Sequence, residues 1–120
     1  MAARLEPGTT VLLYGDLGAG KTAFVRGLAA GLGLDPDAVT SPTFTIVQEY
    51  RGRERTLQHV DLYRLGPAEV ADLALEDLMT PSTVMAIEWA ERLPLMPRGS
   101  VVEVRLEHDG DARRIEVRRP

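Results

Sequence analysis

The sequence predicts an α/β fold with a mixed central sheet, and three observations carry this prediction. The first is a continuous apolar, β-favouring run at residues 10–14 that ends at Gly15 and precedes a helical pattern. The second is another buried-type run at residues 83–87, with a glutamate directly after it. The third is a pair of alternating segments, 101–106 and 113–117, around an Asp-Gly turn. We therefore expect a three-layer domain whose sheet is parallel around its first strand and antiparallel at a C-terminal β-hairpin.

The remaining elements have weaker signals of the same kinds. Apolar spacing indicates helices, short apolar runs indicate strands, and glycine or proline marks the ends. We expect a helix from Lys21 to Leu32 stopped by Gly33, strands over 44–50 and 57–62, a helix over 67–78 broken near Leu73, and a short helical turn after Glu88.

Length and composition set the class of protein. A chain of 120 residues with 44% hydrophobic and 27% charged residues predicts one soluble globular domain over residues 1–120. The absence of cysteine excludes disulfide scaffolds, thiolate zinc sites and cysteine nucleophiles. No apolar run approaches the ~20 residues that span a bilayer, so no membrane association and a cytoplasmic location are expected.

Charge bears on the partners. The net charge of −4 and pI near 5.2 disfavour a protein whose main role is to bind nucleic-acid backbones, because such binding needs a basic surface. RNA is therefore expected only indirectly, through another protein.

A glycine-rich loop carries the strongest functional signal. It fits the Gly-x4-Gly-Lys-Ser/Thr pattern of the P-loop, between the first strand and the first helix. Its glycines let backbone N–H groups point inward at a polyphosphate, the helix N-terminus adds positive potential, and Lys21, the chain's only lysine, reaches the outer phosphates. Thr22 would bind Mg²⁺. The loop consists of Gly15, Asp16, Leu17, Gly18, Ala19, Gly20, Lys21 and Thr22.

A P-loop enzyme also needs a carboxylate at a strand end, and two candidates exist. Glu88 follows the buried-type run 83–87 and is our choice for the metal. Asp61 follows a weaker run and could hydrogen-bond Thr22 or a metal-bound water. Thr43 is either a switch residue that meets Mg²⁺ or the γ-phosphate, or an ordinary loop residue.

Three other residues have open or structural interpretations. Trp89 is either a core residue or a packing wall for the nucleotide or a partner. His59 and His108 lack the spacing of a zinc site or a catalytic triad, so we assign them no chemistry. The guanine-reading Asn-Lys-x-Asp signature needs a second lysine, which the chain lacks, so ATP is the expected nucleotide.

Together these motifs resemble the TsaE (YjeE) family, small bacterial P-loop ATPases of tRNA threonylcarbamoyladenosine biosynthesis. The resemblance rests on the phosphate loop and on three further motifs in the same order. These are Ser41-Pro42-Thr43-Phe44, His59-Val60-Asp61-Leu62-Tyr63-Arg64-Leu65 and Ile87-Glu88-Trp89.

The resemblance implies nucleotide phosphates on the loop, Mg²⁺ on Thr22 and Glu88, and important roles for Asp61 and Trp89. It also implies the TsaD and TsaB proteins as partners, which transfer a threonylcarbamoyl group to adenosine 37 of certain tRNAs. The expected function is slow, Mg-dependent ATP hydrolysis that drives or resets that assembly.

Two departures from the family pattern affect the site. Only fourteen residues precede Gly15, where the family usually has a further strand and helix, so we expect part of the sheet edge and of the base pocket to be short. Ala23 stands where family members often carry a second threonine, which removes one possible hydroxyl contact to phosphate.

Two alternative functions remain open. One is a non-catalytic, ATP-gated binding subunit of the same complex. The other is a small-molecule kinase, which would need an acceptor pocket and a lid. The sequence has no insertion long enough to form such a lid.

A last feature is the acidic segment 65–96. It has six acidic residues and one basic residue, Arg92, and it is either a solvated face or a docking face for a basic partner.

Overall fold

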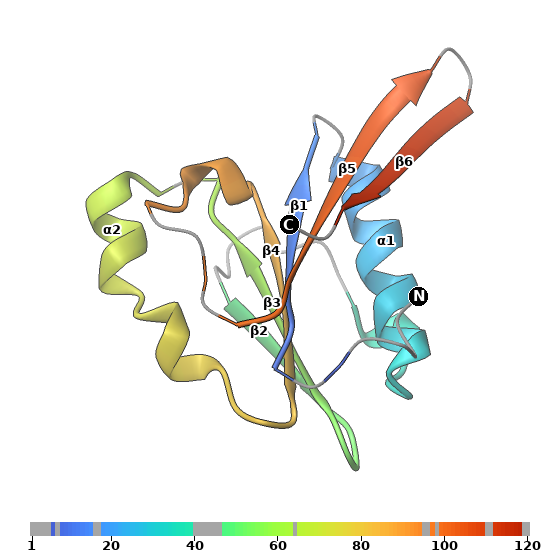
Figure 1. The fold of residues 1–120 in the computed structure, drawn as a ribbon. Helices are drawn as coiled ribbons and strands as arrows, with labels where there is room; N and C mark the ends of the chain where they lie inside the picture. The colour runs from blue at the N-terminus through green and yellow to red at the C-terminus, as the bar shows by residue number, and fades with distance from the viewer. Residues whose placement is uncertain are drawn as a thin grey trace.

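The computed structural model describes residues 6, 8–15, 18–39, 47–63, 65–94, 97, 99–109 and 112–118, without the side chains of 18–22, 107–109 and 112–115. Figure 1 shows a central sheet with helices on both of its faces. The strands are β1 (Thr10–Tyr14), β2 (Val47–Arg51), β3 (Thr56–Asp61), β4 (Thr83–Glu88), β5 (Val101–Asp109) and β6 (Ala112–Arg118). The helices are α1 (Gly18–Gly31) and α2 (Pro67–Asp72), with the short 3₁₀ helices η2 (Pro36–Ala38), η3 (Leu75–Leu78) and η4 (Ala90–Arg92).

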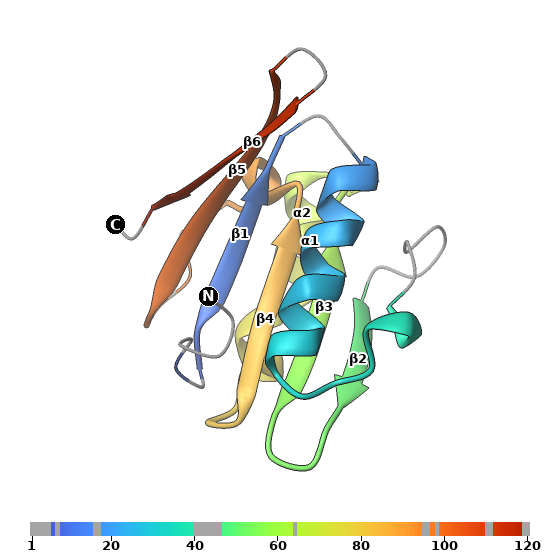
Figure 2. The same ribbon diagram turned by 90° about the vertical axis from the view of Figure 1, so that its right-hand side faces the viewer.

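The six strands form one mixed sheet in the order β2-β3-β4-β1-β5-β6, which Figure 2 shows from the α1 side. The four central strands, β3, β4, β1 and β5, run parallel to one another. Both edge strands are antiparallel to their neighbours. This confirms the α/β prediction and the parallel surroundings of β1, and it adds an antiparallel pair, β2 and β3.

Alternation along the strands divides the core into two layers. Val11 and Leu13 of β1 face α1, whereas Leu12 between them faces α2. Figure 1 shows these helices on opposite sides of the sheet. The α1 layer includes Val25, Leu28, Ala29, Leu57, Val84, Ala86, Val102 and Val104, and the α2 layer includes Val60, Leu62, Val70, Leu75, Met85 and Ile87.

The predicted helix over 67–78 is interrupted as expected. Its first part is α2, and its second part is η3. Ala74 separates them with φ +48°, a left-handed conformation that a non-glycine residue adopts only at a cost. The break lets the polypeptide turn so that both Val70 and Leu75 are buried against the sheet.

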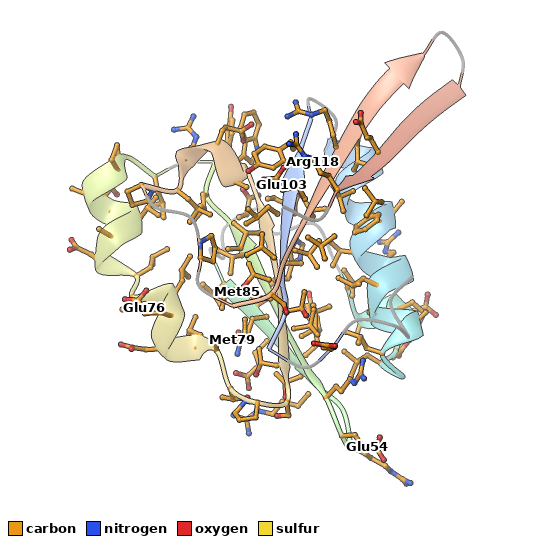
Figure 3. All side chains as sticks on the ribbon, in the orientation of Figure 1. Glu54, Glu76, Met79, Met85, Glu103 and Arg118 are labelled. Carbon is orange, nitrogen blue, oxygen red and sulfur yellow. The ribbon has the colours of Figure 1, made fainter. Side chains whose placement is uncertain are left out.

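The C-terminal hairpin is longer than the apolar pattern predicts. Alternation indicates strands over 101–106 and 113–117, but the backbone ladder continues to the pair Asp109 and Ala112. On the face that lies away from α1, opposite charges stand across from each other: Glu103 is level with Arg118, and Arg105 is level with Glu116. Figure 3 shows Glu103 and Arg118 near the base of this hairpin.

Within the described ranges, no helix combines the length and apolar character that crossing a bilayer requires.

Candidate functional site

The phosphate-loop motif begins where β1 ends. Gly15 has φ +131°, and a Cβ placed on it would lie 2.2 Å from the carbonyl oxygen of Leu106 on β5. Backbone geometry and space therefore both require glycine at the first position of the loop. Helix α1 starts at Gly18, so the strand, loop and helix occur in the predicted order.

The N-terminus of α1 suits an anion. The helix has no acidic residue in its first turn, so nothing there opposes the positive end of its dipole. The amphipathic pattern that predicts this helix buries Val25, Leu28 and Ala29 completely or nearly so. This packing places the start of the helix beside the carboxyl end of β1. Asp16, Leu17 and Thr43 lie outside the described residues, and only the backbone is described for Gly18, Ala19, Gly20, Lys21 and Thr22.

The two predicted carboxylates lie at the same edge of the sheet. Asp61 ends β3 and Glu88 ends β4, and the two residues are register partners. Leu13, near the end of β1, is level with Glu88 on its other side. The carboxylates therefore stand at the carboxyl ends of adjacent parallel strands, next to the start of the loop, where open α/β sheets bind ligands.

The two carboxylates have different surroundings. Glu88 is 4% exposed, whereas Asp61 is partly exposed and accepts a hydrogen bond at Oδ1 from the backbone N–H of Tyr63, at 2.9 Å. That bond closes a turn directly after β3. Burial is costly for a carboxylate unless it is hydrogen-bonded, so the partner of Glu88 matters.

That partner is His59. Its Nε2 lies 2.5 Å from Oε2 of Glu88, and the His59 side chain is fully buried. The sequence-based interpretation of His59 as a strand residue is confirmed, but it gave no indication that His59 contacts the favoured metal carboxylate. The signal was the alternation along β3, which places Leu57, His59 and Asp61 on the face that also carries Ala86 and Glu88.

An aromatic cluster joins the segments that follow β3 and β4. Trp89 has φ +60°, and its ring lies 5.0 Å from the ring of Tyr63, centroid to centroid. The guanidinium of Arg92 lies 5.7 Å from the Trp89 ring and donates a hydrogen bond to the carbonyl of Leu65, at 3.2 Å. Trp89 is a partly buried neighbour of the α2 layer, which agrees with the core interpretation, and its role as a packing wall for the nucleotide or a partner stays a prediction.

Tyr14, the last residue of β1, lies on the α2 side of the sheet. Burial and the nearby carboxylates of Glu103 and Glu91 raise the pKa of its phenol above 10, and Arg105 partly opposes them. The Arg105 guanidinium lies 5.3 Å from the Tyr14 ring centroid. The Tyr14 phenol is therefore neutral at ordinary pH and adds no charge beside the loop that begins at Gly15.

The described oxygen donors at this edge, the carboxylates of Asp61 and Glu88, are of the type that Mg²⁺ prefers. Within the described ranges, no group of three or more His, Asp or Glu side chains could hold a metal ion by itself. A P-loop site does not need one, because Mg²⁺ keeps several waters and binds one or two protein oxygens together with substrate phosphates.

A surface hollow of about 560 Å³ lies at the opposite end of the sheet. It is lined by the residues that follow α1 and by the end of β2 and the β2–β3 turn, namely Leu32, Gly33, Leu34, Asp35, Arg51, Gly52, Arg53 and Glu54. The loop and the carboxylates stand at the carboxyl ends of the strands, so this hollow has no part in the candidate site.

The fold and this edge define an α/β protein of the P-loop class, with its loop between β1 and α1 and two acidic strand ends beside it. Residues 1–116 match the sequence model of the family described as threonylcarbamoyl adenosine biosynthesis protein TsaE. The chain belongs to the TsaE family.

Individual relatives agree with this assignment. The chain is 50% identical over 101 residues to the tRNA threonylcarbamoyladenosine biosynthesis protein TsaE of Synechocystis, covering 81% of this chain and 64% of that protein. It is 41% identical over 117 residues to the Nostoc protein of the same name, covering 94% and 72%. The crystal structure of YdiB from Bacillus subtilis superposes with a TM-score of 0.67 at 35% identity, over 97% of this chain and 70% of that one. This chain thus spans about two thirds of the length of these relatives.

Proposed function

We propose that this protein binds Mg-ATP and hydrolyses it slowly, in support of a TsaB–TsaD complex that makes N6-threonylcarbamoyladenosine at position 37 of tRNA. The single observation that carries the proposal is the register of Asp61 with Glu88 beside the loop after β1, in a chain of the TsaE family. The names of the relatives support the pathway, and the cytoplasm is the location that this pathway implies.

The loop and its helix provide the phosphate site. Backbone N–H groups from Gly15 to the first turn of α1 would donate to phosphate oxygens, with the helix dipole adding positive potential. Lys21 would neutralise the outer phosphates, and Thr43 would respond to the γ-phosphate. A bound Mg²⁺ would supply charge neutralisation between phosphates, and Thr22 and Glu88 are the protein groups proposed to hold it.

Asp61 has a supporting role in this arrangement. Its Oδ1 is engaged by the turn at Tyr63, and its position level with Glu88 allows it to act on the hydroxyl of Thr22 or on a water. ATP is the proposed nucleotide, since Lys21 is the only lysine and the guanine-reading signature needs another.

The alternative is that ATP only gates binding to TsaB–TsaD and that hydrolysis is incidental. A test is phosphate release by the full chain, measured alone and with both partners, combined with co-purification of the partners in the presence and absence of Mg-ATP. Partner-stimulated turnover supports the ATPase. Nucleotide-dependent binding without turnover supports the gated subunit. The absence of both turnover and nucleotide-dependent binding would overturn both functions. A kinase requires phosphate transfer to a small acceptor in place of release to water.

A further inference from the structure

The pair formed by His59 and Glu88 departs from the register of the sheet. His59 is level with Ala86, and Glu88 is level with Asp61. The contact between Nε2 of His59 and Oε2 of Glu88, at 2.5 Å, therefore runs diagonally between the two strands. Both groups are buried, with exposed side-chain fractions of 0% for His59 and 5% for Glu88.

The bond uses one specific atom on each side. An ionised carboxylate can only accept, so a hydrogen bond to ionised Glu88 requires the hydrogen to be on Nε2 of His59. Oε2 of Glu88 takes this hydrogen bond, and Oε1 is not engaged by His59. The other ring nitrogen, Nδ1, is buried and has no hydrogen-bond partner within the described residues.

The unpartnered Nδ1 bears on why a histidine occupies this position. A buried polar atom without a partner costs about 1–3 kcal/mol. An apolar side chain on this face, among neighbours such as Leu57 and Ala86, would avoid that cost. The bond from Nε2 to Glu88 is thus the contribution that distinguishes histidine from leucine here.

We propose that His59 is the positioning residue for Glu88. Its Nε2–H holds Oε2, so that the carboxylate has one orientation and Oε1 is kept for a divalent cation at the phosphate site. This inference rests on the proposed Mg-ATP site. Outer hydrogen-bond partners of metal ligands act in this way in other proteins, and their loss typically weakens metal binding by about 10- to 100-fold.

Three substitutions separate the hydrogen bond from the bulk of the ring. In His59→Gln, the side-chain nitrogen is the same number of bonds from Cα as Nε2, so the donor to Glu88 is retained. In His59→Asn, the nitrogen is one bond nearer the backbone, at the position of Nδ1. In His59→Leu the donor is lost. Gln58→Leu is a matched control, because Gln58 is equally buried on β3 but donates instead to Glu49 on the other face.

The experiment titrates Mn²⁺ into the full chain with ADP held below the protein concentration, and free Mn²⁺ is followed by electron paramagnetic resonance. We expect the Mn²⁺ dissociation constant to rise about 10- to 100-fold in His59→Leu and His59→Asn. We expect the Mn²⁺ dissociation constants of His59→Gln and Gln58→Leu to stay within about threefold of the wild-type value, because substitutions that leave the interaction intact change a binding free energy only slightly. Calorimetric ADP binding with EDTA should be equal in all five proteins, and circular dichroism confirms that each is folded.

Three results would overturn the inference. Mn²⁺ binding by His59→Leu that equals the wild type would show that Glu88 needs no help from His59. Equal loss in His59→Gln and His59→Leu would show that the ring, and not its hydrogen bond, is what matters. A wild-type chain that binds ADP but has no Mn²⁺ site would refute the proposed metal role of Glu88 along with this inference. If His59→Leu does not fold, the comparison of His59→Gln with His59→Asn decides the question.

Discussion

Asp61 and Glu88 stand level with each other at the ends of β3 and β4, yet only Glu88 is buried and bonded to a histidine. Two carboxylates at one sheet edge thus have different environments: Asp61 closes the turn to Tyr63, and Glu88 lies under the helical layer of α1. The proposed division, with the metal on Glu88 and a supporting role for Asp61, thus assigns different roles to two carboxylates that have different surroundings.

The substitution Glu88→Gln tests that division. It keeps the size of the side chain and an oxygen that can accept from His59, but it removes the negative charge that a hard cation prefers. We expect Mg²⁺-dependent hydrolysis to fall strongly while ATP binding is largely retained. Phosphate release at several Mg²⁺ concentrations measures this, with Glu91→Gln, an exposed neighbour on η4, as the control. A wild-type rate and magnesium dependence would make Glu88 structural and Asp61 the better metal candidate.

The substitution Lys21→Ala tests the phosphate loop. Removing a charged hydrogen-bond donor to phosphate costs about 1.5–3 kcal/mol, so ATP affinity should fall about 10- to 150-fold in a calorimetric titration. Arg26→Ala is the matched control on the same helix, because Arg26 donates to the carbonyl of Val39 at 3.1 Å, away from the loop. Unchanged ATP affinity in Lys21→Ala would remove the phosphate-loop assignment.

The sequence allowed the elements and their order to be predicted because buried strands, helical spacing and glycine stops are local signals. The pairing of His59 with Glu88 was missed for a different reason. Alternation indicates that the two residues share a face of the sheet, but a contact two positions off register also depends on side-chain conformation, which periodicity does not encode. The hairpin was underestimated because residues 107–109 are polar, and a two-stranded ladder can continue on backbone hydrogen bonds without an apolar face.

Replacing Gly15 should destabilise the fold. In Gly15→Ala the new Cβ meets the Leu106 carbonyl oxygen at 2.2 Å, and alanine must also adopt φ +131°. Backbone strain of this kind costs about 1–3 kcal/mol before any shift of β5 is counted. Urea unfolding measures the change. Gly27→Ala in α1 is the control, because nothing lies within 4 Å of its Cβ and alanine favours a helix by about 0.5–1 kcal/mol. Equal stability of the two variants would contradict the close approach of Gly15 to β5.

Tyr14 predicts a loss of stability at alkaline pH. The fold raises the pKa of its phenol above 10, mainly through burial and then through Glu103 and Glu91. The neutral phenol is therefore favoured in the native state. This contribution to stability is complete below pH 10, the phenol's ordinary pKa, and is lost as the pH rises through the higher native value.

The measurement is the free energy of unfolding between pH 9 and 11.5, about the range in which tyrosine ionises, for the wild type and Tyr14→Phe. The decline should be smaller in Tyr14→Phe. In an ultraviolet titration of the native protein, Glu103→Gln should bring the pKa of Tyr14 closer to 10. Identical alkaline declines in wild type and Tyr14→Phe would show that Tyr14 does not cause the effect.

The last prediction concerns the acidic segment 65–96, part of which forms the helical layer over β3 and β4. Glu69, Asp72, Glu76 and Asp77 are all exposed on α2 and η3, and these helices connect the strand that ends at Asp61 to the strand that ends at Glu88. A partner docked there would contact the segment that links both carboxylates.

An acidic surface speeds the approach of a basic partner, and salt weakens the effect. We expect Glu76→Arg combined with Asp77→Arg to slow association with TsaB–TsaD while leaving ATP binding by the isolated chain unchanged.

The control reverses two equally exposed charges elsewhere, Asp37→Arg on η2 and Glu54→Arg at the β2–β3 turn, so that the net charge changes by the same amount. Figure 3 shows Glu54 at the tip of that turn and Glu76 on the helical layer, on separate parts of the molecule.

Surface-based kinetics at low and moderate salt give the association rates. A slower rate for the first pair alone, with the difference shrinking at moderate salt, places the partner on the α2 side. Equal rates for both pairs at low salt would make the segment a solvated face, because a docked basic surface must respond to charges beneath it more than to charges on the far side of the sheet.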